Sequence, residues 1–421
     1  MKRAVLWLLA LLLALPGAAA AQKDEADEAR RIVTLLLRGD TDAVYARFAD
    51  AMRQAMSAEQ LALVPAQLQA MAGEFVGFGR SQALGTTVVQ VVEMSGMNLL
   101  AQVSFTPEGQ VQGLAFVPQQ KPKPEPPADN EEAVLVGPYD LPGVLTLPDG
   151  EGPFPAAVLV HGSGPNDRNE TNGNTAIFRD LAQALSRQGI AVLRYDKRTY
   201  QVNQGALSLT QAEIDNMTVY EETMEDAVAA VRLLREDARI DAGRVFIVGH
   251  SLGGMLAGQI ETAGAGARGL VLLAGTLRPL CEVMADQLEA LGGDMAEEAA
   301  LARALSDMDE AQARQVTLLG VNGYYYWDEA RRDREDAFVR AGLPMLVLQG
   351  GQDRQVYADR DFPLWQAFAQ AHPDMDVTLR LYEALGHSFT SGDALDPRVS
   401  EEIAGWMLSY GPAEEEEEEE E

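Results

Sequence analysis

The chain has 421 residues, of which 47% are apolar and 23% charged, and its formal net charge is −31. This length and composition predict a folded protein of two domains, with three as the alternative. The excess of negative charge argues against nucleic acid and against an anionic membrane surface as partners. The only cysteine, Cys281, allows no intrachain disulfide and no cysteine-based zinc cluster, so we expect it to be a small buried side chain.

The first residues have the pattern of an export signal. Lys2 and Arg3 precede an apolar run over residues 4–15, and small residues follow it. The apolar run is shorter than the roughly 18 residues that a spanning helix needs. We therefore predict a signal peptide over residues 1–21, export to the periplasm or the medium, and no membrane span after cleavage. An uncleaved N-terminal anchor is the alternative.

Residues 23–117 form a first module with two kinds of periodicity. Ile32, Val33 and Leu36 repeat on one helical face, and residues 57–60 read as a capping box that opens another helix. Four predicted strands follow, at residues 75–82, 87–94, 97–106 and 111–117. Helices followed by antiparallel strands predict a small α+β domain, whose element order resembles NTF2-like modules. It contains no histidine or cysteine, so we expect a spacer or binding role.

Two segments have compositions that do not support a packed core. Residues 118–132 are rich in proline and charge, which predicts a linker between the modules. Residues 412–421 include a run of eight glutamates, and such a run repels itself, so we predict a disordered acidic tail.

Residues 133–410 alternate short apolar runs with amphipathic stretches. The predicted strands lie at residues 133–136, 144–147, 156–160, 190–195, 244–248, 269–273, 345–349 and 377–382. Predicted helices begin near Thr175 and at a capping box over residues 218–221. This alternation predicts an α/β fold, a mostly parallel sheet with helices on both faces.

A serine lies at one strand-to-helix corner of this domain. Residues 245–254 read VFIVGHSLGG, so Ser251 follows a buried strand and Leu252 begins a helix. Gly249 and Gly253 would let the strand and the helix approach closely, as in a nucleophile elbow. The helix N-terminus at Leu252 would favour an anion. The alternative is a turn serine without chemistry.

A nucleophilic serine needs a base, and the chain has four histidines. His387 follows the last predicted strand, where a base on a C-terminal loop would reach the corner. His161 and His250 are expected to pack or hydrogen-bond structurally. His372 is expected to face solvent.

The base needs an acid to orient it, and Asp353 is the candidate. It follows the predicted strand at residues 345–349, and sites in open α/β sheets collect at the carboxyl ends of strands. Asp361 and Asp393 are the rival acids. Asp353 acting only as a loop or capping residue is the alternative.

Four short motifs, each after a predicted strand, carry a specific resemblance. They are HGSG at residues 161–164, GHSLG at 249–253, GQD at 351–353 and GH at 386–387. With them, residues 133–410 resemble the α/β-hydrolases, in the branch of exported esterases and serine-aminopeptidase-like enzymes.

The resemblance implies a role for five residues. Ser251 would be the nucleophile, His387 the base and Asp353 its orienter. The backbone N–H groups of Leu252 and Ser163 would form the oxyanion hole. No metal and no organic cofactor is implied.

One stretch departs from the family pattern. Many relatives have Asp-x-Arg-Gly after the next strand, whereas this chain has Asp196-Lys197-Arg198-Thr199. The missing glycine predicts a differently shaped loop near the site and leaves the substrate open. Asp196 and Arg198 are expected to form a structural ion pair, with a binding site as the alternative.

Residues 276–340 lie between two core strands and are predicted to be a helical insertion. They end in the aromatic run YYYW at residues 324–327. The insertion is either a lid that supplies a substrate pocket, or a segment that these aromatics dock on the core.

Together these features predict a secreted serine hydrolase that cleaves small carboxylic esters through an acyl-enzyme. A serine aminopeptidase-like amide hydrolase or an acyl transferase would use the same triad. A non-catalytic binding protein on a hydrolase scaffold is the alternative from another class.

Overall fold

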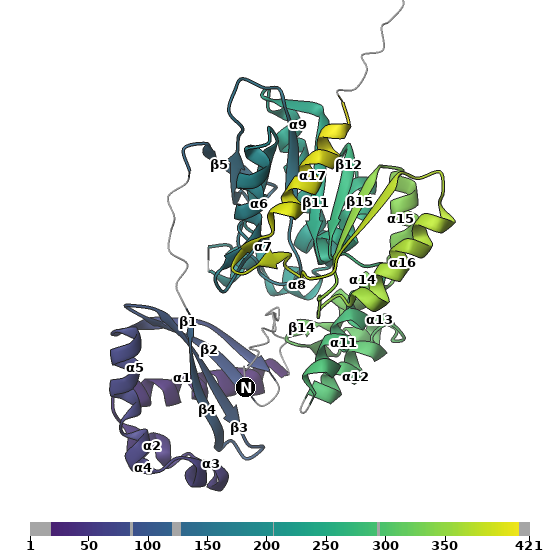
Figure 1. Cartoon of the computed structure of the whole chain (residues 1–421). Coiled ribbons are helices and arrows are strands. Elements are labelled where there is room, and N and C mark those ends of the chain that lie inside the picture. Colours follow the sequence, from purple (N-terminus) through teal and green to yellow (C-terminus); the bar gives the residue numbers. More distant parts are fainter. Residues whose placement is uncertain (1–17, 85–86, 120–127, 205, 293–294, 412–421) are drawn as a thin grey trace, which may run out of the picture. The chain divides into compact units, whose positions relative to one another are not determined.

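The computed structural model describes residues 18–84, 87–119, 128–204, 206–292 and 295–411 (Figure 1). Most of the predicted signal peptide and the whole predicted acidic tail lie outside these residues. The chain divides into two compact units, an N-terminal domain and a C-terminal domain, that meet in sequence near residue 126. Among the described residues, no helix combines the length and the apolar character needed to cross a bilayer.

The N-terminal domain has helices first and an antiparallel sheet second, so its predicted α+β character is confirmed. The helices are α1 (Ala18–Leu37), α2 (Thr41–Tyr45), α3 (Asp50–Ala55), α4 (Ala58–Leu61) and α5 (Val64–Ala72). The strands are β1 (Phe75–Leu84), β2 (Thr87–Met94), β3 (Asn98–Phe105) and β4 (Val111–Gln119), paired in chain order.

Burial in this domain follows the two periodicities. Every second residue of β2 is buried, and Val88 and Val92 pack in one core with Ile32 and Leu36 of α1. The predicted capping box is present, because Ser57 and Gln60 each bond the backbone N–H of the other. The resemblance to NTF2-like modules stays a prediction.

The C-terminal domain is built on an eight-stranded sheet. Its strands are β5 (Glu131–Val136), β6 (Leu141–Thr146), β7 (Phe154–Val160), β10 (Ala191–Tyr195), β11 (Ile240–His250), β12 (Gly269–Leu273), β15 (Met345–Gly350) and β16 (Val377–Tyr382). The strand order is β16-β15-β12-β11-β7-β10-β6-β5, parallel from β16 to β10 and antiparallel at β6 and β5. The predicted mostly parallel sheet is confirmed. Since β4 ends at Gln119 and β5 begins at Glu131, both ends of the predicted linker lie in strands.

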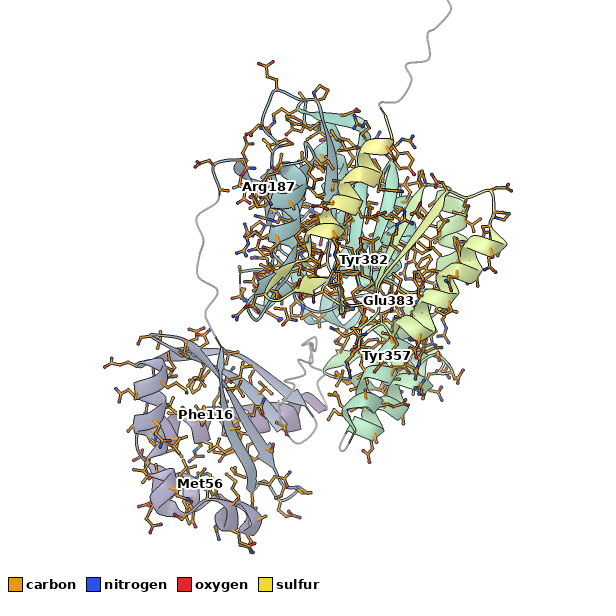
Figure 2. All side chains as sticks on the ribbon, viewed as in Figure 1. Met56, Phe116, Arg187, Tyr357, Tyr382 and Glu383 are labelled. Carbon is orange, nitrogen blue, oxygen red and sulfur yellow. The ribbon has the colours of Figure 1, made fainter. Side chains whose placement is uncertain are left out.

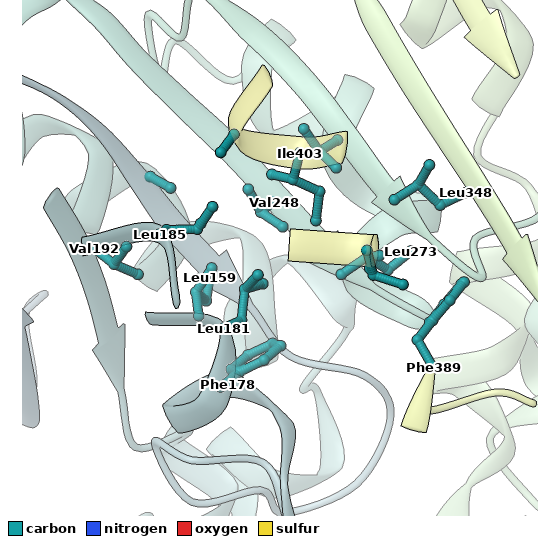
Figure 3. Packing of buried hydrophobic residues seen from close by; sticks show 14 of the residues in the cluster. Leu159, Phe178, Leu181, Leu185, Val192, Val248, Leu273, Leu348, Phe389 and Ile403 are labelled. Carbon is teal, nitrogen blue, oxygen red and sulfur yellow. The ribbon is translucent and has the colours of Figure 1, made fainter. Parts of the chain in front are cut away.

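Helices cover both faces of this sheet (Figure 1). They are α6 (Ile177–Ser186), α9 (Glu225–Glu236), α10 (Leu252–Thr262), α16 (Ala358–Ala371) and α17 (Pro397–Ser409). Every residue of β12 and β15 is buried, as expected for strands covered on two sides. On one face, Leu181 of α6 and Ile403 of α17 pack against Leu159 and Val248 of the central strands (Figure 3).

Two segments outside the sheet complete the domain. Between β10 and α9 lie α7 (Arg198–Asn203), α8 (Gln211–Asp215) and a π-helical turn, η1 (Tyr220–Met224). The insertion at residues 276–340 contains α11 (Leu280–Leu291), α12 (Ala296–Ala304), α13 (Glu310–Ala313), β13 (Thr317–Leu318), β14 (Val321–Asn322), α14 (Gly323–Ala330) and α15 (Arg334–Ala341). Short hairpins are formed by β8 (Thr171–Asn172) with β9 (Thr175–Ala176), and by β17 (Thr390–Ser391) with β18 (Ala394–Leu395).

The insertion is therefore mainly helical, as expected, and its last helix belongs to the core. A Cβ at Gly258 of α10 would lie 2.8 Å from the ring of Phe338 on α15, so the two helices pack closely. Cys281 on α11 is fully buried, as predicted. Burial raises the pKa of its thiol to about 12, which keeps the thiol protonated.

The contribution of the α17 face can be measured with two substitutions on one helix. Ile403 is fully buried, whereas Leu408 is 43% exposed. Ile403→Ala should lower the free energy of unfolding by about 2–5 kcal/mol, and Leu408→Ala by less than about 0.5 kcal/mol. Urea unfolding followed by tryptophan fluorescence reports this domain, which holds Trp327, Trp365 and Trp406. Equal losses for the two variants would contradict the packing described here.

Candidate active site

Ser251 lies in a turn that few residues other than glycine adopt. Its φ of +53° and ψ of −116° place it in a strained conformation between β11 and α10. A Cβ at Gly249 would lie 2.3 Å from the backbone of Gly253, and a Cβ at Gly253 would lie 2.2 Å from the carbonyl oxygen of Val160. Only glycine fits at these two positions, so the predicted strand-turn-helix corner is present with the close approach it needs.

The corner stands at the carboxyl end of the central strand, and neighbouring strands hold it there. The N–H of Ser251 donates to the carbonyl of Leu273 at the end of β12, at 2.7 Å. Leu252 is the first residue of α10, and the first N–H groups of a helix have no acceptor within the helix. The Leu252 N–H is therefore one of the donors that the helix offers beside Ser251, at its positive end.

Asp353 and His387 are joined directly. Asp353 Oδ2 accepts a hydrogen bond from His387 Nδ1 at 2.8 Å. Asp353 Oδ1 accepts from the N–H groups of Gln355 and Val356, at 2.8 and 3.0 Å, and Gln349 Nε2 donates to Oδ2 at 3.1 Å. Burial alone would raise the pKa of Asp353, but the His387 ring and these backbone donors outweigh it and hold the pKa below its usual value.

The ionised carboxylate sets the state of the histidine. A carboxylate only accepts hydrogen bonds, so His387 carries a proton on Nδ1 and Nε2 is left as the basic nitrogen. The Asp353 loop itself is packed against the end of β16, since the N–H of Gly351 donates to the carbonyl of Tyr382 at 2.8 Å. Figure 2 shows Tyr382 and Glu383 at this end of the strand.

The loop that carries His387 is held beside the serine corner. His250 Nε2 lies 3.1 Å from the carbonyl oxygen of His387, and the centroids of the two rings are 4.8 Å apart. The residue next to Ser251 in the chain therefore contacts the candidate base directly. The three predicted triad residues follow the carboxyl ends of β11, β15 and β16, of which β15 and β16 are adjacent and β12 separates β15 from β11.

The rival acids lie elsewhere. Asp361 is fully buried and accepts from Arg278 and from the hydroxyl of Thr276. Asp393 is exposed on the turn between β17 and β18. His372, which we expected to face solvent, is half-buried at the end of α16, and its ring centroid lies 4.7 Å from that of Phe368. The ring is therefore partly exposed to solvent and partly covered by this aromatic neighbour.

Residues 161–164, which we call the oxyanion loop after their predicted role, pass directly beside the serine. A Cβ at Gly162 would lie 3.2 Å from Ser251 Cβ, so the loop and the corner touch. Asn166 Nδ2 donates to the carbonyls of Gly162 and Ser163, at 3.2 and 3.1 Å, and Gly164 turns the chain with a φ of +90°. The loop therefore brings Gly162, the residue before Ser163, against Ser251, and the part of the Ser163 N–H in an oxyanion hole stays a prediction.

Glu170 is a buried residue of the site that the sequence did not reveal. Its Oε1 accepts from the N–H of Gly162 at 2.8 Å and lies 3.1 Å from His250 Nδ1. Burial alone would lower the pKa of His250, but the Glu170 carboxylate outweighs it and the pKa is raised. Glu170 thus ties the oxyanion loop to the serine corner. It lies in a polar loop with no periodic pattern, so nothing in the sequence marks it.

His161 has the structural role that we expected. Its ring packs against Phe178 and Tyr195, with centroids 5.1 and 5.3 Å away, and its Nε2 lies 3.1 Å from the carbonyl of Asp167. Within the described ranges, no group of three or more histidine, cysteine or acidic side chains is arranged to hold a metal ion.

Asp196 and Arg198 do not pair with each other, so that expectation was wrong. Asp196 pairs with Arg168 at 2.8 Å, and Arg198 pairs with Asp226 at 2.7 Å and with Glu225 at 2.6 Å. Asp196 follows the end of β10, whereas Arg198 is the first residue of α7, and there the two side chains have different partners.

The aromatic run of the insertion is mostly buried. Tyr325 and Tyr326 are only 2% and 4% exposed, and the Tyr325 hydroxyl donates to Glu222 at 2.7 Å. Trp327 Nε1 donates to the carbonyl of Met308 at 2.8 Å. These contacts favour the docking interpretation for Tyr325 and Tyr326.

The link through Glu170 can be tested by titrating the histidines. Burial lowers the pKa of His250, and the Glu170 carboxylate opposes this effect. Glu170→Gln removes the carboxylate, so the pKa of His250 should fall from its raised value. Because the pKa of His250 is higher in the folded protein than the 6.5 of a free imidazole, its protonation stabilises the fold. This stabilisation is fully present below pH 6.5 and is lost as the pH rises through the pKa of the folded protein. NMR of the imidazole C2–H signals measures this, with His372 as the internal control. An unmoved His250 titration would contradict the pairing.

Comparison with known proteins shows what this chain is similar to. A family model described as "Alpha/beta hydrolase family" matches residues 157–397. The Esterase EstD of Thermotoga maritima is 36% identical over 330 residues, which are 73% of this chain and 76% of that protein.

The solved structures that match this chain include two esterases. Est1E from Butyrivibrio proteoclasticus is 19% identical, with a TM-score of 0.45 over 67% of this chain and 98% of that one. The propionate-bound Est2 of Thermogutta terrifontis is 20% identical, with a TM-score of 0.43 over 68% and 95%. On the strength of the family match and the Thermotoga relative, this chain belongs to the alpha/beta hydrolase family.

Proposed function

We propose that this chain is an exported serine hydrolase that cleaves small carboxylic esters. The observation that carries the proposal is the hydrogen bond between Asp353 and His387, on a loop that His250 holds beside Ser251. The name of the Thermotoga relative, an esterase, supports the ester as substrate. The pattern of residues 1–21 supports export.

In the proposed reaction, Ser251 Oγ attacks the acyl carbon and His387 Nε2 takes the hydroxyl proton. The ionised Asp353 stabilises the imidazolium that forms. The N–H groups of Leu252 and Ser163 receive the negative oxygen of the tetrahedral intermediate. The imidazolium then protonates the leaving alcohol, and an acyl-enzyme remains on Ser251.

The second half of the cycle reverses these roles. Water attacks the acyl carbon while His387 takes a proton from it, and the second intermediate collapses to the carboxylic acid and free Ser251. We propose that the insertion lies over this site as a lid, with Tyr325 and Tyr326 docking it on the core. In this arrangement, the acyl pocket would be shaped by the insertion's other side chains.

The nucleophile is tested by removing a single oxygen atom. Ser251→Ala should abolish turnover of a p-nitrophenyl ester and labelling by a fluorophosphonate probe, because no other group would form the covalent bond. Ser409→Ala, at the exposed end of α17, is the matched control and should retain both. Full activity in Ser251→Ala would end the proposal, and a wild-type chain that is never labelled would point to a binding protein.

The orienting acid is tested with the same substitution at two aspartates. Asp353→Asn should lower kcat by about 10³–10⁴-fold. An amide no longer holds His387 in the tautomer that has its proton on Nδ1 and its basic nitrogen at Nε2. Asp393→Asn changes an exposed rival acid and should leave kcat unchanged. Steady-state kinetics on the same ester measure both. Equal effects would show that Asp353 does not orient the base.

A further inference from the structure

A buried lysine donates a hydrogen bond to the backbone of the oxyanion loop. Lys197 is 1% exposed, and its Nζ donates to the carbonyl oxygen of Gly162 at 2.9 Å. The same Nζ lies 2.9 Å from Glu222 Oε1, in an ion pair whose side chains are 2% and 0% exposed. Placing an ammonium group in a dry interior is unfavourable unless it is paired and hydrogen-bonded. Here both of its contacts are strong ones.

Glu222 is held by several donors in addition to the lysine. The hydroxyl of Tyr325 donates to Oε2 at 2.7 Å, and those of Thr199 and Thr223 donate at 3.2 Å each. Burial and the nearby carboxylate raise the pKa of Tyr325, so its hydroxyl stays a donor. Glu222 lies on the π-helical turn η1, and such turns are frequent at functional sites.

The carbonyl that Lys197 contacts belongs to a particular peptide group. The C=O of Gly162 and the N–H of Ser163 are the two ends of one planar peptide unit. A cation at the oxygen fixes the direction of the whole unit and withdraws electrons from it, which strengthens its N–H as a donor. In the proposed function, the Ser163 N–H is one of the two donors of the oxyanion hole, and the Leu252 N–H is the other.

We propose that Lys197 and Glu222 are positioning residues that orient and polarise the Gly162–Ser163 peptide for the oxyanion. The proposal rests on the proposed function. Tyr325 extends the connection to α14, so the insertion is linked through Glu222 and Lys197 to the oxyanion loop. The pair acts through the peptide unit and makes no contact with substrate.

A second buried ion pair, with its arginine three residues before Lys197 in the chain, offers a matched control. Arg194 of β10 pairs with Glu131 at 2.5 Å, with side chains 4% and 7% exposed. The other side chains that donate to Glu131, those of Gln183 and Thr146, lie on α6 and β6. This pair resembles the first in burial and charge but bonds no residue of the oxyanion loop.

The experiment compares Lys197→Met/Glu222→Gln with Arg194→Met/Glu131→Gln, so that no buried charge is left alone in either protein. The measurements are kcat and KM on a p-nitrophenyl ester, and inhibition by a trifluoromethyl ketone, whose serine adduct places an oxyanion in the hole. The matching methyl ketone, which stays a ketone, reports binding without the oxyanion.

In the Lys197/Glu222 variant, kcat should fall by roughly 10–100-fold, less than the 10²–10³ for complete loss of a donor. KM should change by less than about twofold, and affinity for the trifluoromethyl ketone should fall with kcat. Affinity for the methyl ketone should not change. The control variant should keep all four values, whatever its loss of stability.

If the folded Lys197/Glu222 variant binds the trifluoromethyl ketone as tightly as the wild type, the positioning role is overturned while Ser251 keeps its proposed role. If the wild type neither reacts with the ketone nor is labelled at Ser251, the proposed function fails and this inference fails with it. If the double variant does not fold, Tyr325→Phe replaces it. Loss of that hydroxyl should weaken trifluoromethyl ketone binding by about threefold to tenfold, and an unchanged affinity overturns the proposal.

Discussion

The C-terminal domain depends on a steric constraint, the lack of side chains where β7, β11 and α10 meet. Because Gly249, Gly253 and Val160 approach backbone to backbone, the turn between strand and helix is forced into the conformation that Ser251 adopts. The oxyanion loop continues directly from Val160, so the same contact brings Gly162 against the serine. One close approach thus sets both the nucleophile and the peptide proposed to receive the oxyanion, and a methyl group at either glycine would disturb both.

Around this corner, buried charged side chains hold loops that have no regular secondary structure. Glu170 joins the oxyanion loop to His250, Lys197 joins it to Glu222, and Asp353 holds His387. Each of these groups is buried in the protein interior. Electrostatic interactions are stronger there than in water, and an unpaired charge is costly. Loops held in this way have one preferred arrangement, which is what a reaction centre built from three strand ends requires.

The sequence predicts the sheet and the three candidate triad residues because each signal is local. A strand buried on both faces is a continuous apolar run, and Ser251 and Asp353 each follow such a run. His387 follows the partly exposed edge strand β16, which its β-branched and aromatic residues mark. Glu170 and Glu222 were missed because their partners are distant in the chain and a single acid in a polar stretch resembles any surface residue. The π-helical turn η1 was also missed, since one extra residue in a turn leaves the amphipathic pattern of the following helix unchanged.

The single thiol of the chain has a consequence for how the insertion can be studied. Cys281 is sealed inside α11 and its thiol is protonated at neutral pH, so it reacts with an alkylating reagent only after that helix separates from its neighbours. Because the chain has no second cysteine, the rate at which the native protein is alkylated measures how often the region around α11 opens. Measured against the unfolding rate of the whole domain, this rate would show whether the insertion opens by itself or only when the domain unfolds.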